Sequence, residues 1–191
     1  MGRPTDRFTE IYNHSLIKQR AIHSIRASFT ETTVSTLLVK PLVEHGTVVA
    51  ANPGRVRMTY TDPERKILTM DGRTLTIVWP DGHGREHIDI SDIQKRVDQY
   101  FTNASIDQLR AMFEIVAEPD LTMNHTDRVD MRPKRKPIQA GLDRLALWVD
   151  RDTDLLVQIR LSFPGGDEKT ISLQDFALNV PVTDDLFRGR V

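Results

Sequence analysis

The sequence predicts an α+β fold that is mainly β, with an antiparallel sheet preceded by an N-terminal helix. From about residue 29 to residue 90, apolar and polar residues alternate in six short segments, which is the period of a half-buried strand. Turn sequences such as Asp71-Gly72 and Asp81-Gly82 separate segments, and turns of this kind join antiparallel strands. Six consecutive strands indicate an antiparallel sheet, because a parallel sheet needs crossover helices.

The N-terminal segment has a helical period. Apolar residues, among them Phe8, Ile11 and Ile22, recur at roughly helical spacing with polar residues between them. Thr5 can serve as the N-cap. We therefore expect a helix over residues 5–28.

The strand segments that follow are TETTVSTLLV, GTVVAA, RVRMTYT, RKILTMD, RTLTIVW and HGREHIDI. Alternate side chains of a strand point to the same side of the sheet. The alternation therefore places one apolar set on the inner face of a curved sheet. The set is Val56, Met58, Tyr60, Leu75, Ile77 and Trp79.

Two short helices interrupt the β pattern. SDIQKRVDQYFTN and SIDQLRAMF begin at the natural caps Ser91 and Ser105, and each has one apolar face. Five more strand segments follow, namely FEIVAE, LTMNHTDRVDMR, LDRLALWVD, DLLVQIRLSF and KTISLQDFAL. With no repeat, low-complexity tract or linker, the chain is expected to form one domain over residues 1–191.

The composition narrows the classes of function. The chain has 26 Lys+Arg against 27 Asp+Glu, so it lacks the basic excess of a general nucleic-acid binder. It has no cysteine, which excludes disulfides, thiolate catalysis and Cys-ligated metals. No apolar run reaches the length of a membrane span, and MGRPTDRFTE has no apolar segment of a secretory signal.

Few residues point to chemistry. His83 and His87 share a face of a predicted strand and could meet a metal, but no third ligand is assured and a solvated hairpin is the simpler interpretation. The basic stretch MRPKRKP, residues 131–137, could touch phosphates or an acidic partner, or be a solvated loop. GxSxG, P-loop and dinucleotide motifs are missing. We therefore expect no catalytic residue, cofactor or metal, and no enzyme activity.

The inward apolar residues have two interpretations. Most such residues simply form a core. However, Met58, Met70, Met112 and Met123 fall among them, and methionine is an adaptable lining for irregular apolar guests.

Taken in order, these segments resemble the periplasmic outer-membrane lipoprotein carriers, the LolA-type family, over roughly residues 7–188. The resemblance rests on SIRASFTET at the end of the predicted helix and on three later features. These are the strand from Asn52 to Pro63, the Asp71-Gly72 hairpin, and the closing pattern from Asn179 to Phe187. It implies an incomplete antiparallel β-barrel, with an N-terminal helix and short lid helices over a hydrophobic cavity.

The same resemblance implies a function. The chain would be a non-catalytic periplasmic carrier, its signal removed, that binds lipid or lipoprotein acyl chains and transfers them toward the outer membrane. The six inner-face residues would line the cavity. An inner-membrane release complex and an outer-membrane acceptor would be partners, with no nucleic acid involved. The lid would consist of Ile93, Val97, Phe101, Leu109 and Met112.

The chain departs from the family pattern in three places. Typical carriers have an arginine that helps hold the lid shut immediately before the proline that precedes the third strand, and Asn52 stands there instead. Met58 replaces a common aromatic, and Phe29-Thr30-Glu31 replaces Phe-x-Gln. These changes indicate a divergent member with a different lipid cargo or a different release trigger.

Two alternatives remain open at this point. One is a periplasmic regulatory module that senses envelope lipids or lipoproteins and docks a partner through a patch such as Arg132–Lys136. The other is a hydrolase that uses His83 or His87.

Overall fold

The computed structural model describes residues 6–82, 84–92, 95 and 104–188. Internal contacts divide the chain into two compact units. The first unit comprises Met1–Ala21, Thr32–Leu42 and Asn103–Ser172. The second comprises Ile22–Glu31, Val43–Thr102 and Leu173–Val191.

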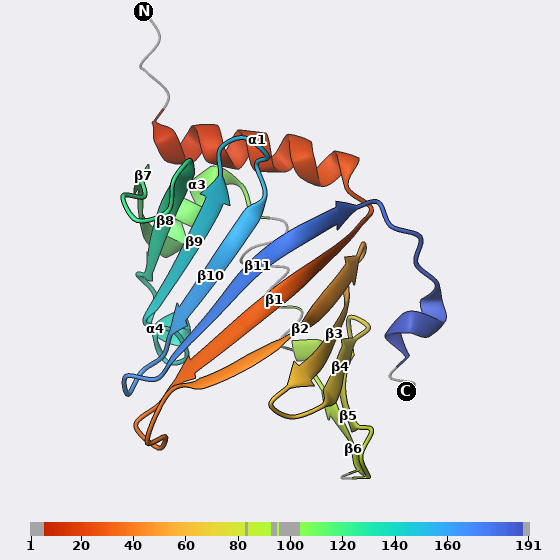
Figure 1. Ribbon diagram of the computed structural model, residues 1–191. Helices are drawn as coiled ribbons and strands as arrows, with labels where there is room; N and C mark the ends of the chain where they lie inside the picture. The colour runs from red at the N-terminus through yellow and green to blue at the C-terminus, as the bar shows by residue number, and fades with distance from the viewer. Residues whose placement is uncertain (1–5, 83, 93–94, 96–103, 189–191) are drawn as a thin grey trace, which may run out of the picture. The chain divides into compact units, whose positions relative to one another are not determined.

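Eleven strands of the described chain form one antiparallel sheet in the order β6-β5-β4-β3-β2-β1-β11-β10-β9-β8-β7 (Figure 1). Since β6 and β7 are the end strands, the sheet is not closed. The strands are β1 (Ser24–Val34), β2 (Leu42–Ala51), β3 (Arg55–Asp62), β4 (Lys66–Met70), β5 (Thr74–Trp79), β6 (Gly84–Asp89), β7 (Phe113–Pro119), β8 (Thr126–Pro133), β9 (Arg144–Asp150), β10 (Leu156–Ser162) and β11 (Glu168–Leu178).

The described helices are few and mostly short. They are α1 (Arg7–Ala21), α3 (Ile106–Met112), α4 (Lys136–Gln139) and the 3₁₀ helix η2 (Asp184–Phe187). None of the helices in the described part of the chain is both long and apolar enough to cross a membrane. The predicted fold class is confirmed: a mainly β chain with an unclosed antiparallel sheet, an N-terminal helix and a few short helices.

The predicted end of the first helix is wrong. The helix stops at Ala21, and residues from Ser24 onward belong to β1. Ile25 and Phe29 fit a helical spacing, but Ala27, Phe29 and Glu31 are buried in alternation, as expected of a strand. The backbone NH of His23 donates to Asn179 Oδ1 at 2.8 Å, which fixes the start of the strand.

The first unit is built around one apolar face of β7, β8 and β9. The register aligns Met131 with Ile115 on one side and with Leu145 on the other, and Phe113 with Pro133. Phe113, Met131 and Leu145 are buried. α3 begins with a full capping box between Ser105 and Gln108, so the predicted cap is confirmed.

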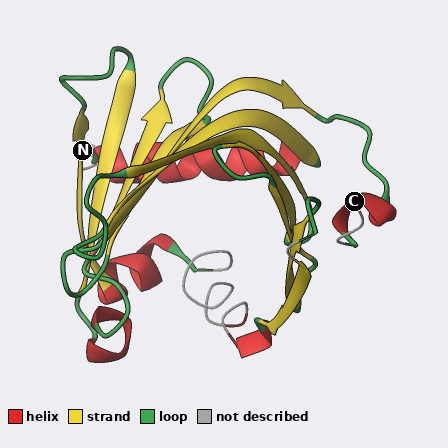
Figure 2. Cartoon of the chain, turned by 60° about the horizontal axis from the view of Figure 1, so that its bottom comes forward, coloured by secondary structure: helices red, strands yellow, loops and turns green. Residues whose placement is uncertain are grey.

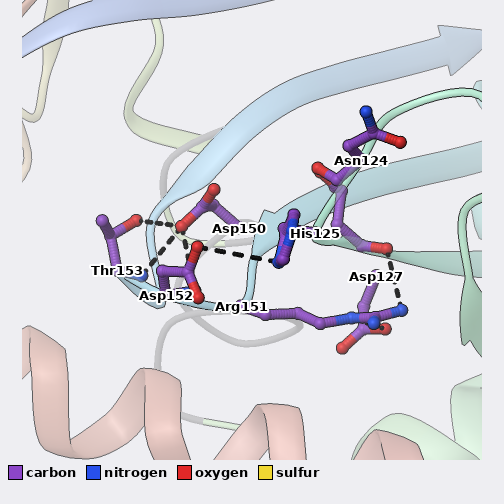
Figure 3. Close-up of polar contacts among 8 residues, drawn as sticks. Asn124, His125, Asp127, Asp150, Arg151, Asp152 and Thr153 are labelled. Atoms are coloured by element: carbon purple, nitrogen blue, oxygen red, sulfur yellow. Dashed lines mark hydrogen bonds and ion pairs between the residues drawn. The ribbon is translucent and has the colours of Figure 1, made fainter.

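A buried carboxylate ties α1 to this sheet. Asp127 of β8 accepts a hydrogen bond from Arg7 Nε of α1 at 2.7 Å and another from Arg151 Nε at 3.0 Å. Arg151 also donates to the carbonyl of Thr126 at 3.3 Å. Figure 3 shows Asp127 and Arg151 beside the β9–β10 turn, where Asp150 Oδ1 accepts from the Thr153 hydroxyl at 2.8 Å. One acidic side chain thus joins three segments that are distant in sequence.

Trp148 on β9 is a second residue of this unit that is held by several contacts. Its buried indole lies between two guanidinium groups, Arg128 at 5.3 Å and Arg160 at 5.4 Å from the ring centroid. The indole Nε1 donates to Asp120 Oδ2 at 2.8 Å. The hydroxyl of Thr122 donates to the other carboxylate oxygen at 2.6 Å, and this bond is the main reason that the pKa of Asp120 lies well below its usual value.

We expect Asp120→Asn to remove a pH-dependent part of the stability. A carboxyl whose pKa is lower in the folded state stabilises the fold above its unfolded pKa of about 3.9, and this contribution is lost as the pH falls toward the folded pKa. The stability difference between the parent and Asp120→Asn should therefore be full at neutral pH and shrink below about pH 4. Urea unfolding followed by tryptophan fluorescence measures it. A difference that stays constant down to about pH 2 would contradict this assignment.

Candidate functional site

The second unit presents one almost wholly apolar sheet face. The register aligns Met58 with Val48 on β2 and with Leu68 on β4, and Leu68 with Ile77 on β5. Paired residues share a face, so the six residues predicted from the alternation lie together. With their neighbours they form what we call the apolar face, namely Val48, Ala50, Val56, Met58, Tyr60, Leu68, Met70, Leu75, Ile77 and Trp79.

The apolar face is not sealed. All of its members except Tyr60 are half-buried, so each keeps part of its surface accessible. On the opposite face of β4 and β5, by contrast, Ile67, Thr69, Thr76 and Val78 are all buried. The apolar face is therefore the less completely covered side of these two strands. The apolar face therefore has room to gain contacts with an apolar guest.

The C-terminal segment packs on the opposite face. Arg57 of β3, whose side chain points away from the apolar face, donates to the carbonyl of Leu186 at 3.0 Å. Arg55 forms an ion pair with Asp184 and lies 5.1 Å from the ring centroid of the buried Phe187. Figure 2 shows η2 beside these strands. The C-terminal segment therefore leaves the apolar face open.

A buried polar cluster borders the apolar face at the Tyr60 end of β3. The Tyr60 hydroxyl donates to Glu31 Oε2 at 3.1 Å, and its ring stacks edge-on against Phe29 at 4.9 Å. Lys66 Nζ lies 4.3 Å from the ring centroid and 2.6 Å from Glu44 Oε1. Glu31 and Glu44 are only 3% and 5% exposed. Sequence reasoning missed this cluster because its members come from several strands, and no spacing along the chain links them.

The cluster has a defined protonation state at Tyr60. Burial, and then the neighbouring Glu31 carboxylate, raise the pKa of Tyr60 far above its usual value. The phenol therefore stays protonated at ordinary pH and acts as a hydrogen-bond donor. The Tyr60 hydroxyl therefore forms a polar border at this end of the apolar face.

Asn52, at the predicted latch position, holds a different segment. It lies in the turn between β2 and β3, where its side-chain Nδ2 donates to the carbonyl of Ile22 at 3.0 Å. Its backbone NH donates to the carbonyl of His23 at 3.1 Å. Asn52 therefore tethers the entry to β1, and the expectation that the arginine latch of the family does not carry over to this position stays a prediction.

The predicted lid lies only partly in the described chain. Ile93, Val97 and Phe101 are outside the described residues. Leu109 and Met112 belong to α3 of the first unit, where both are buried. The lid role of all five residues stays a prediction.

The remaining candidates give no reactive cluster. His83 is outside the described residues, and His87 on β6 has its Nδ1 3.0 Å from Thr76 Oγ1. Within the described ranges, no group of three side chains could hold a metal ion. The basic stretch at 131–137 is not a loop throughout: it completes β8 and enters α4.

A hollow of about 580 Å³ lies in the first unit, and none of the predicted cavity residues lines it. Its lining is largely charged, with Asp6, Arg7, Arg110, Glu114 and Lys134 among the side chains. The apolar face, not this hollow, is the surface suited to an acyl chain.

Several solved structures share this fold at low sequence identity. An uncharacterized conserved protein from Thermus thermophilus is 8% identical, with 96% of this chain and 93% of that chain covered and a TM-score of 0.59. The Mycobacterium tuberculosis lipoprotein LppX is 13% identical, with 91% and 96% covered and a TM-score of 0.52. At these identities the likeness shows the fold alone.

A chain of the Pseudomonas aeruginosa MucA/MucB complex is also similar, at 16% identity and a TM-score of 0.52. The alignment covers 94% of this chain but only 59% of that chain, so this chain spans a little over half of its length. A comparison with curated protein sequences finds no match.

The sequence itself matches the family model described as outer membrane lipoprotein carrier protein LolA over residues 20–189. The match spans every strand of the sheet and the C-terminal segment. The chain therefore belongs to the LolA family, whose members carry lipoproteins or lipids.

Proposed function

We propose that the protein is a non-catalytic periplasmic carrier that holds lipid or lipoprotein acyl chains against the apolar face. The half-buried state of that face carries the proposal, since it offers contiguous apolar surface on β2 to β5 that is still accessible. The transfer of each methylene group of an acyl chain from water to an apolar surface is favourable by about 0.8 kcal/mol. Membership of a lipoprotein-carrier family supports the same function.

The neighbouring groups limit where an acyl chain can lie. Met58 and Met70 adapt their shape to a flexible guest. Beyond Tyr60, the ionised pair of Lys66 and Glu44 would lose hydration without gain if a hydrocarbon covered it. The acyl chain should therefore extend from Met58 toward Ile77 and not past Tyr60.

We expect Met58→Glu to weaken binding of a fluorescent fatty acid by about tenfold or more, because a carboxylate beside the hydrocarbon would be desolvated. Ile77→Glu should act in the same direction. Thr47→Glu is the matched control, because Thr47 is exposed on β2 and its side chain lies on the opposite face. Fluorescence titration gives the affinities, and circular dichroism checks that each variant is folded.

Unchanged affinity in folded Met58→Glu and Ile77→Glu would refute the proposed site. Two results together would favour the regulatory module over the carrier. The parent chain would bind no fatty acid, and mass spectrometry of the chain purified without detergent would detect no lipid. If lipid does accompany the purified chain, the same spectra identify the cargo.

A further inference from the structure

The β1–β2 connection exposes a cluster of apolar side chains at its tip. Leu37 and Val39 are 90% and 107% exposed, so their side chains stand clear of the rest of the chain. Val34, Leu38 and Leu42 flank them and are each about two-fifths exposed, at 42%, 41% and 39%. We call these five residues the apolar tip. Scattered single apolar residues on a surface are ordinary, but a cluster of this kind marks an interaction site.

The apolar tip is held in place by hydrogen bonds. The NH of Leu38 donates to the carbonyl of Ser35 at 3.0 Å, and the NH of Leu37 donates to Ser35 Oγ at 3.3 Å. The NH of Thr36 donates to Asp167 Oδ1 at 3.3 Å, which ties the tip to the β10–β11 turn. The backbone therefore presents Leu37 and Val39 to the solvent in a fixed turn.

Several basic side chains lie at the same end of the first unit. Lys40 belongs to the connection itself and is exposed. Arg135 and Lys136 are exposed at the start of α4, and within the described chain neither forms an ion pair. α4 precedes β9 in the chain. The backbone NH of Asp143, the residue before β9, donates to the carbonyl of Ser162 at the end of β10. Ser162 lies next to the β10–β11 turn that holds the tip. Figure 1 shows α4 and these turns at one end of the strands.

Two carboxylates lie at the same end: Asp167 accepts the bond from Thr36 at the base of the tip, and Asp143 directly precedes β9. The three exposed cations Lys40, Arg135 and Lys136 outnumber these two carboxylates. Lys134 is also present, with its Nζ donating to the carbonyl of Arg110 at 2.8 Å. A protruding apolar tip bordered by free cations matches the boundary between anionic headgroups and acyl chains.

We propose that the apolar tip docks this protein on an anionic bilayer surface. Leu37 and Val39 enter the interface, while Lys40, Arg135 and Lys136 lie at the level of the lipid phosphates. A bilayer fits better than a protein receptor, because two small convex side chains need a deformable apolar phase and not a matching pocket. No residue of the apolar tip belongs to the apolar face, so we expect docking both with and without cargo.

The test is flotation of the full chain with vesicles of phosphatidylethanolamine and phosphatidylglycerol in equal parts, beside vesicles of phosphatidylcholine alone. The parent should float with the anionic vesicles and bind less at high salt. The affinity of the double variant Leu37→Asp/Val39→Asp for the anionic vesicles should be lower by about tenfold or more. Arg135→Gln/Lys136→Gln should lose most of the salt-dependent part.

Leu121→Asp is the matched control, since Leu121 is 97% exposed on the β7–β8 turn and is not part of the tip. Docking should survive in Leu121→Asp and in Ile77→Glu, which separates it from acyl-chain binding. A parent that floats with neither vesicle overturns the proposal. So does a tip variant that floats as well as the parent, including the case in which the tip proves to bind only a protein.

Discussion

Asp127→Ala is expected to lower the free energy of unfolding by about 3 kcal/mol. Asp127 is buried and accepts bonds from Arg7 and Arg151, so its removal leaves two guanidinium groups without their shared partner. Both arginine side chains are about one-third exposed, at 36%, and can turn partly to water. The loss should therefore fall near the lower end of the range for a broken buried ion pair.

The control for this experiment is Asp185→Ala. Asp185 pairs with Arg188 three residues along the chain, with both side chains mostly exposed. Such a surface pair should contribute at most about 0.5 kcal/mol. Urea unfolding of both variants at neutral pH gives the comparison. Equal losses would mean that Asp127 does not anchor α1.

Gly46→Ala should destabilise the second unit by about 2 to 3 kcal/mol. A Cβ at Gly46 would lie 2.1 Å from the carbonyl oxygen of Thr59 and 2.8 Å from the Phe29 ring. The carbonyl belongs to the paired strand β3 and cannot swing away as a side chain can. The added methyl group must therefore separate β2 from β3 or displace the Phe29 ring from Tyr60.

Gly141→Ala is the matched control for this change. Gly141 lies after α4, and a Cβ there would have open space around it. Alanine at such a position is neutral or stabilising, within about 1 kcal/mol. Thermal unfolding of both variants measures the contrast. If Gly46→Ala unfolds with the parent, β2 and β3 do not approach as closely as described.

Alternation was enough to predict the common face of Val56, Met58 and Ile77. The side-chain period of a strand depends only on its own backbone, and a hairpin fixes the register of its neighbour. The same rule could not locate the end of α1, because Phe29 fits both the helical and the strand period. The chain leaves the helix after Ala21, where Asn52 and Asn179 form hydrogen bonds with the backbone of Ile22 and His23. Both asparagines are distant in sequence from the helix.

Two other features depended on contacts that no local pattern encodes. No spacing along the chain links Glu31 with Lys66, yet both contact Tyr60 from other strands. Leu37 and Val39 fell within a segment that was predicted as a strand, whereas β1 ends at Val34 and leaves them in a turn. Hydrophobicity alone does not distinguish a side chain that packs inside from one that is presented outside.

The unclosed sheet has a consequence for aggregation. An end strand presents unpaired NH and CO groups on which a strand from another molecule can add. β6 is one such end strand, and all six of its residues are exposed. It carries Arg85, Glu86 and Asp89, charges that a second copy would have to place beside its own. The charges of β6 therefore oppose the edge-to-edge polymerisation to which an open sheet is prone.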